Sequence, residues 1–169
     1  MQNRQLAGYS GLQIGLHWLI AALVFFQLVF GESMTTVVDA NAEGTAASPA
    51  DIAFSTAHYW FGLSILALVA MRLALRLVQG VPPKTNETST WMSLAAKLVH
   101  WLFYGLLIAV PVVGLLALYV APDLGDIHAL AKPAFIILIS LHVIAALFHQ
   151  LVLKDGTLKR MFVSSGRTR

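Results

Sequence analysis

Four long apolar runs constrain the fold of this 169-residue chain more than any other feature. Each run is long enough to cross the roughly 30 Å hydrocarbon core of a bilayer, which takes about 20 helical residues. Backbone polar groups find no partners in lipid, so segments of this kind form helices. The runs predict helices over about 10–30, 51–78, 91–119 and 126–153.

The composition also indicates a membrane protein. Hydrophobic residues make up 58% of the chain and charged residues 11%, and the mean hydropathy is +0.76, a balance that soluble domains do not reach. We therefore predict an all-α, integral membrane four-helix bundle that forms a single domain over residues 1–169. The first run also fits a signal peptide, but it is longer than an ordinary apolar h-region and contains His17 and Gln27, which favours a retained helix.

Positive charges lie almost entirely on one side of the predicted bundle. They fall at the N-terminus, around the second connection or in the tail, as Arg4, Arg72, Arg76, Lys84, Lys97, Lys154, Lys159, Arg160, Arg167 and Arg169. The first and third connections are acidic and have only Lys132 beside them. The positive-inside rule then predicts that both termini are cytoplasmic. The same rule explains the basic pI as a topology signal, so nucleic acid is not an expected partner.

Six histidines lie within the apolar runs, where ionisable side chains are costly and usually functional. The predicted orientation places His58 and His128 near the outer surface, and His17 and His142 toward the cytoplasm. On a continuous helix, the 14 residues from His128 to His142 make a nearly whole number of turns and rise about 21 Å. His149 continues the same stripe.

Two pairs at matched depths follow, namely His58 with His128 and His17 with His142. A porphyrin iron held by two imidazoles from facing helices needs such pairs. Zinc usually needs a tetrahedral ligand cluster, which pairs at two depths do not supply, although spacing alone leaves zinc and a proton relay open. The chain has no cysteine, which excludes thiolate ligands and iron–sulfur clusters. Two stacked haem sites would form an electron path across the bilayer.

Four further residues have alternative roles. His100 reaches roughly the depth of the inner pair, and His149 lies about 10 Å nearer the cytoplasm. Each contacts a haem propionate or a quinone, passes protons, or makes an ordinary polar contact between helices. Arg72 and Arg76, at positions i and i+4, either pair with propionates or quinone oxygens or anchor the cytoplasmic end of their helix.

In their order and spacing, these residues resemble the bacterial cytochrome b561 family of four-helix dihaem proteins along nearly the whole chain. The matching stretches are Tyr9-Ser10-Gly11-Leu12-Gln13-Ile14, His17-Trp18-Leu19, His58 with Gly62 and Ser64-Ile65-Leu66, Arg72 with Leu75-Arg76-Leu77, His100 with Tyr104, Pro111 and Gly114, His128, Leu141-His142 with Ala145-Ala146-Leu147 and His149, and Lys154-Asp155-Gly156-Thr157-Leu158. The likeness is greatest to the superoxide oxidase type.

The resemblance implies a multi-pass protein of the bacterial inner membrane with two b-type haems. Such proteins take electrons from superoxide at the periplasmic face and pass them to ubiquinone. In this chain the resemblance implies that ubiquinone binds near His17, His142 and His149. A similar haem pattern in the cytochrome b subunits of formate dehydrogenases and nickel–iron hydrogenases supports the same ligand pairs. A homodimer of this chain is one further assembly that we consider.

The identity of the electron donor stays open in the sequence. The connection from Val120 to Gly125 is short for the superoxide oxidase type, and the acidic outer surface does not favour an anion such as superoxide. The alternative is a membrane anchor and electron conduit that serves a separate dehydrogenase or another periplasmic redox protein.

Overall fold

The computed structural model describes residues 8–80 and 90–164. Four helical segments in this part of the chain are long and apolar enough to cross a membrane, judged by length and composition. The segments are α1 (Gly11–Phe30), α3 (Pro49–Gln79), α4 (Thr90–Tyr119) and a fourth made of α5 (Leu124–Ala129) with α6 (Ala131–Leu151). The predicted all-α membrane bundle is confirmed. The second predicted connection, from Gly80 to Thr90 with Pro82-Pro83, lies mostly outside the described residues.

Side-chain caps set the start of two of these helices. The Ser10 hydroxyl accepts the backbone N–H of Gln13, and the Gln13 side chain accepts the backbone N–H of Ser10, which forms a capping box before α1. The Ser48 hydroxyl accepts the backbone N–H of Asp51 at the start of α3. Pro49 occupies the first turn of α3, where its missing N–H leaves no hydrogen bond unmade.

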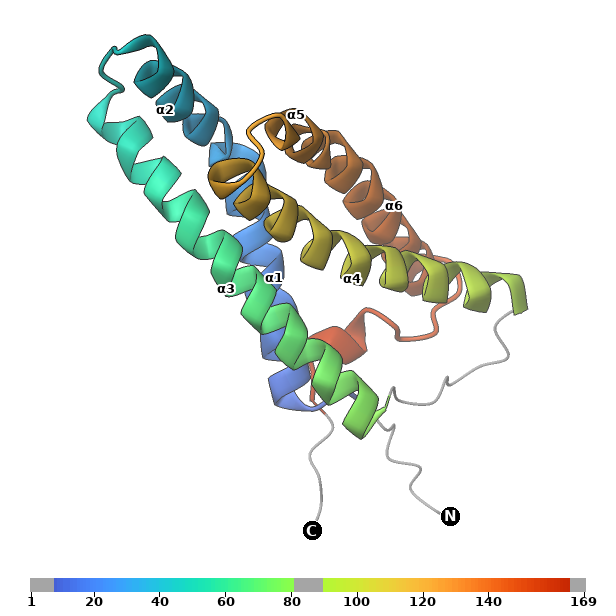
Figure 1. Cartoon of the computed structure of the whole chain (residues 1–169). Helices are drawn as coiled ribbons and strands as arrows, with labels where there is room; N and C mark the ends of the chain where they lie inside the picture. The colour runs from blue at the N-terminus through green and yellow to red at the C-terminus, as the bar shows by residue number, and fades with distance from the viewer. Residues whose placement is uncertain (1–7, 81–89, 165–169) are drawn as a thin grey trace, which may run out of the picture.

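The polar stretch between the first two predicted spans, residues 31–50, is typical of a loop in sequence, but that prediction is wrong for most of its length because the stretch is helical. Helix α2 (Glu32–Glu43) follows directly after Gly31 and ends at Gly44, whose φ of 69° is a conformation that favours glycine. Polarity suggested a loop, but α2 packs against α3, and such packing stabilises a helix whose own sequence is only weakly apolar. Figure 1 shows α1 and then α2 running alongside α3.

The single helix predicted over 126–153 is interrupted near its start. Helices α5 and α6 are separated at Leu130, so His128 and His142 lie on different helices. Pro133 has no N–H to donate to the carbonyl four residues earlier and its ring crowds that turn, which accounts for the interruption just before it. The 14-residue spacing therefore does not by itself place the two rings on one stripe.

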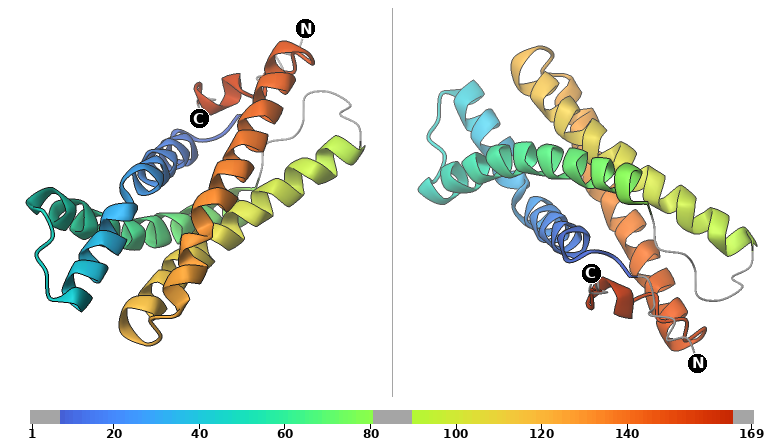
Figure 2. Two further views of the ribbon diagram at one scale, coloured as in Figure 1. Left: turned by 90° about the horizontal axis from the view of Figure 1, so that it is seen from above. Right: turned by 90° about the horizontal axis from the view of Figure 1, so that it is seen from below.

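A small buried cluster joins the spanning helices. Helix α3 packs against α1 and α4, and α4 packs against α6, as the views in Figures 1 and 2 show. The cluster consists of Ile20, Val24, Ile65, Val69, Tyr104 and Phe135. Many large apolar side chains instead face outward, as expected where lipid is the surrounding medium.

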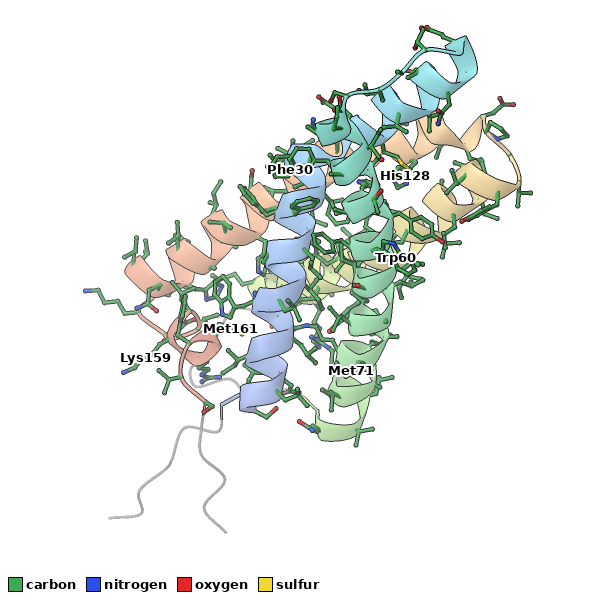
Figure 3. All side chains as sticks on the ribbon, turned by 90° about the vertical axis from the view of Figure 1, so that its left-hand side faces the viewer. Phe30, Trp60, Met71, His128, Lys159 and Met161 are labelled. Carbon is green, nitrogen blue, oxygen red and sulfur yellow. The ribbon has the colours of Figure 1, made fainter. Side chains whose placement is uncertain are left out.

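The C-terminal segment folds back against the start of the bundle. It contains the short 3₁₀ helix η1 (Lys159–Met161). The Trp18 Nε1–H donates to the carbonyl of Met161 at 2.8 Å, and the indole packs on Phe162 with ring centroids 5.0 Å apart. Figure 3 shows Met161 near α1, at the end of the bundle opposite to His128.

We predict that Val69→Ala destabilises the protein by about 1–2 kcal/mol, because the lost methyl groups leave a cavity in the most buried position of the bundle. Val78→Ala, the same change on the same helix at a residue that is 84% exposed, should have almost no effect. The midpoint of SDS denaturation in a mild detergent measures the stability of both variants. Equal midpoints for the two variants would contradict this description of the core.

Candidate functional site

His58 of α3 and His128 of α5 form an outer pair, near the end of the bundle that carries α2. Their ring centroids are 5.9 Å apart, and the ring planes make an angle of 77°. A metal bound at about 2.0 Å from one nitrogen of each ring holds the two centroids roughly 6 Å apart. The spacing of this pair fits coordination of one metal ion from two sides.

Helix α4 fixes the orientation of the His128 ring. The Nδ1 atom lies 3.0 Å from the carbonyl oxygen of Val110. A carbonyl oxygen only accepts, so the proton is on Nδ1 and the Nε2 lone pair is available to a metal. A Cβ atom at Gly114 would lie 2.8 Å from Cε1 of the ring, so the close approach of His128 to α4 requires glycine there.

His58 lies against the junction between α1 and α2. A Cβ atom at Gly31 would lie 3.4 Å from both Nδ1 and Cε1 of the His58 ring. The Gln27 amide Nε2 donates to the backbone carbonyl of His58 at 2.9 Å. The chain therefore approaches this histidine closely from α1 as well as from its own helix.

Three histidines from three helices gather toward the other end of the bundle. The His142 ring centroid on α6 lies 6.3 Å from that of His17 on α1 and 5.5 Å from that of His100 on α4. The His100 Nδ1–H donates to the carbonyl of Ala96 at 2.5 Å, so its Nε2 also keeps a lone pair. Ring distances alone thus allow either partner for His142. In the described residues, no three His, Cys, Asp or Glu side chains converge to hold one metal ion.

Arg72 and Arg76 of α3 lie beside this inner cluster. Arg72 donates from Nη1 to the carbonyl of Gln13 at 2.7 Å and interacts electrostatically with the inner histidines. The Arg76 guanidinium carbon lies 5.8 Å from the ring centroid of Tyr104. Both arginines line a small cleft together with Tyr9, Gln13, Gly80 and Tyr104. Guanidinium groups here suit a carboxylate or a carbonyl oxygen of a bound molecule.

His149 does not join the inner cluster by any ring contact in the described residues, and it pairs with Asp155 just beyond α6. The His149 Nδ1–H donates to Asp155 Oδ2 at 2.5 Å, and the backbone N–H of Thr157 donates to Oδ1 at 2.9 Å. Burial raises the pKa of Asp155, but the two hydrogen bonds outweigh burial and hold it below its usual value. The pair fixes the His149 proton on Nδ1 and leaves Nε2 as the acceptor atom.

The outer end of the structure carries one ion pair between helices. Lys132, near the start of α6, pairs with Glu32 at the start of α2. The hydrogen bond from Lys132 and its positive charge lower the pKa of Glu32, which stays ionised. Lys132 is the only lysine or arginine that the sequence places at this end, and it is paired with a carboxylate.

The structure brings both predicted histidine pairs together and adds His100 to the inner one. Reasoning from the sequence did not single out Gln27, Gly31 or Asp155 as site residues. Asp155 has a recognisable signal after the fact, because an acidic residue before Gly156 forms a tight turn that returns its carboxylate to the helix end. Gln27 and Gly31 acquire their places only through the packing of α1 on α3.

The chain is similar to known proteins over most of its length. Residues 8–164 match the profile of the family described as prokaryotic cytochrome b561. The chain is 40% identical over 155 residues to cytochrome b562 of Cereibacter sphaeroides, which covers 91% of this chain and 94% of that protein. It is 32% identical over 175 residues to the probable superoxide oxidase CybB of Yersinia pestis, with 90% and 94% covered. Cytochrome b561 homolog 1 of Escherichia coli K12 is 26% identical over 176 residues, with 90% and 96% covered.

Gly114→Ala should displace the His128 ring, because the added Cβ atom would overlap it. If His128 ligates one of two haems, the variant loses roughly half of the haem per chain. Gly105→Ala adds the same methyl group to the same helix at a position with no atom within 4 Å, and it should keep full haem content. Haem absorbance per chain measures both variants. Full haem in Gly114→Ala would contradict the role of His128.

Proposed function

The chain belongs to the prokaryotic cytochrome b561 family, whose members bind b-type haem, and we propose that it passes electrons from a periplasmic-side donor to ubiquinone with two such haems. One observation carries this proposal. Two histidine pairs from facing helices have ring centroids 5.9 and 6.3 Å apart, close to the spacing of about 6 Å that a shared metal ion requires. When bound, b-type haem supplies a one-electron redox centre.

His58 and His128 are the proposed ligands of the outer haem, and His17 and His142 those of the inner haem. Helix packing favours His17 over His100 as the partner of His142. Helix α4, which carries His100, packs directly against α6, whereas the main packing of α1 is against α3. A flat macrocycle needs space between the two helices that supply its ligands, and α1 and α6 leave more of it.

The two proposed haem sites lie at different depths of the bundle. Helix α3 is continuous between His58, in the outer pair, and Arg72, beside the inner cluster. Those 14 residues rise roughly 21 Å, which is most of the thickness of a hydrocarbon core. The arrangement suits transfer of electrons across the membrane more than chemistry at one surface.

The inner end supplies groups that a quinone site needs. Reduction of a quinone to the quinol takes up two electrons and two protons. Arg72 and Arg76 offer hydrogen bonds to haem propionates or to quinone oxygens. His149 holds one proton on Nδ1 against Asp155, so its Nε2 can take up and release another next to the predicted cytoplasmic surface.

Superoxide is the proposed donor, and the protein is then a superoxide:quinone oxidoreductase. The support is the relative of 32% identity that is named a probable superoxide oxidase. Two superoxide ions lose one electron each and leave as dioxygen, while one quinone gains both electrons and two protons. The likeness extends over 90% of this chain and 94% of that protein.

One observation favours a second candidate, in which the chain is the membrane anchor and electron conduit of a separate redox protein. Lys132 is paired with Glu32, so the outer end offers no unpaired lysine or arginine in the described residues to attract an anion. An acidic surface instead complements a donor protein with a basic docking face.

A spectroscopic experiment tests the proposal. The purified protein is first titrated for haem per chain, and the oxidised form is then mixed with superoxide, with and without superoxide dismutase. Haem reduction that superoxide dismutase abolishes, followed by haem reoxidation by ubiquinone, supports superoxide as the donor. Two haems that superoxide does not reduce point to a protein donor. Absence of haem would overturn both candidates.

His58→Ala and His142→Ala should each remove one haem and keep the other, because they belong to different pairs. The reduced-minus-oxidised spectrum of each variant should keep about half of the wild-type amplitude. His100→Ala should keep the full amplitude if His17 is the ligand opposite His142. Loss of both haems from a correctly inserted single variant would contradict independent pairs.

His149→Ala should keep both haems and slow the reoxidation by ubiquinone about tenfold or more, because a proton-exchanging group is lost. Reduction of the oxidised protein from the outer side should proceed at the wild-type rate, which serves as the internal control. Asp155→Asn, which keeps a weaker acceptor for Nδ1–H, should slow reoxidation less. Wild-type turnover in His149→Ala would remove this residue from the quinone site.

A further inference from the structure

The two outer histidines differ in how their second ring nitrogen is satisfied. The Nδ1 atom of His128 donates to the carbonyl of Val110. The Nδ1 atom of His58 is buried and has no hydrogen-bond partner in the described residues. A histidine that binds a metal through one nitrogen almost always donates the other N–H to an acceptor, and no water is available within lipid. His58 therefore needs an acceptor from the protein.

Gln27 has the complementary unpaired atom. Its Nε2 donates to the backbone carbonyl of His58 at 2.9 Å, but its Oε1 is buried and has no partner. Two residues that already share one hydrogen bond thus carry one unsatisfied donor site and one unsatisfied acceptor. Pairing these two atoms would satisfy both residues at once.

Two glycines lie beside the amide and the ring. Gly62 follows His58 by one turn of α3, and a Cβ atom there would lie 3.4 Å from Nε2 of Gln27. A Cβ atom at Gly31 would lie 3.4 Å from Nδ1 of His58. The end of α1 therefore lies close to the Nδ1 edge of the ring, and its Gln27 amide lies close to the backbone of α3.

We propose that Gln27 is a positioning residue of the outer haem site, whose Oε1 accepts the Nδ1–H of His58 when Nε2 of that ring holds iron. The two atoms are not hydrogen-bonded to each other in this structure, so pairing requires the ring or the amide to turn. The Nε2 of Gln27 keeps its bond to the His58 carbonyl. One side chain then fixes the backbone and the ring of the same ligand. This inference rests on the proposed ligand role of His58.

The consequence is an effect on redox potential rather than on haem retention alone. An acceptor on Nδ1 makes the imidazole a more basic ligand, which stabilises ferric over ferrous iron and lowers the midpoint potential. Removal of the acceptor should raise that potential. A purely structural role for Gln27 predicts loss of haem or of protein without this signed shift.

The test is a redox titration of wild type, Gln27→Leu and Gln27→Glu, followed by visible absorbance, with electron paramagnetic resonance spectra of the oxidised forms. In Gln27→Leu, one haem should shift to higher potential, by up to a tenfold change in its oxidised-to-reduced ratio at fixed potential, about 59 mV. Gln27→Glu keeps an acceptor oxygen, so the same haem should stay unchanged or shift to lower potential. The other haem should not change in either variant.

Gln150→Leu is the matched control. Gln150 also has a buried Oε1 without a partner, but it lies at the opposite end of the bundle beside His149. It should not shift the haem that responds to Gln27. The inference is overturned if both Gln27 variants raise the midpoint potential of that haem or if neither does. It is also overturned if Gln150→Leu raises the same potential equally. If Gln27→Leu does not assemble, a higher midpoint potential of that haem in Gln27→Glu is sufficient to reject the inference.

Failure of the proposed function is distinguishable from failure of this inference. Fewer than two haems in the wild type, or an unchanged spectrum in His58→Ala, would reject the ligand assignment itself. Two haems with the expected loss in His58→Ala, but no signed shift in the Gln27 variants, would reject only the role of Gln27.

Discussion

The approach of imidazole rings to one another inside a medium without water is the constraint on which the rest of this structure depends. Each ring has two nitrogens, and in lipid both must find partners within the protein. Backbone carbonyls meet part of this demand at His100 and His128, and a carboxylate does so at His149, where α6 ends. Few residues of the described chain are fully buried, and many large apolar side chains of the spanning helices face outward.

The sequence was sufficient for the features that depend on composition and spacing alone. Apolar length predicted the spanning helices, and charge placement supplied the depths from which the pairs of His58 with His128 and of His17 with His142 followed. The sequence was insufficient for features of the fold that tertiary contacts determine. Helix α2 forms because α3 covers one of its faces, and no local signal in residues 31–50 shows that contact. The ring of His100 joins His142 through the packing of α4 on α6.

The two ends of the bundle are electrostatically different in a way that matches the proposed direction of electron flow. The inner end has two arginines beside the histidines and a half-buried histidine–carboxylate pair. The outer end has its lysine paired with Glu32 on a surface that is otherwise acidic. Exposed pairs of this kind contribute little to stability, so the main effect of the Glu32–Lys132 contact is to tie α2 to α6 and to cancel a charge.

The interruption at Leu130 has a consequence for the two proposed ligands of the fourth span. Each proposed histidine pair takes one member from this span, His128 from α5 and His142 from α6. The break is shallow, because Leu130 keeps helical backbone angles, donates its N–H to the carbonyl of Asp126 and accepts the N–H of Ala134. The two segments therefore stay connected through the helical hydrogen-bond ladder, and a shift of either histidine along the span would be passed on to the other.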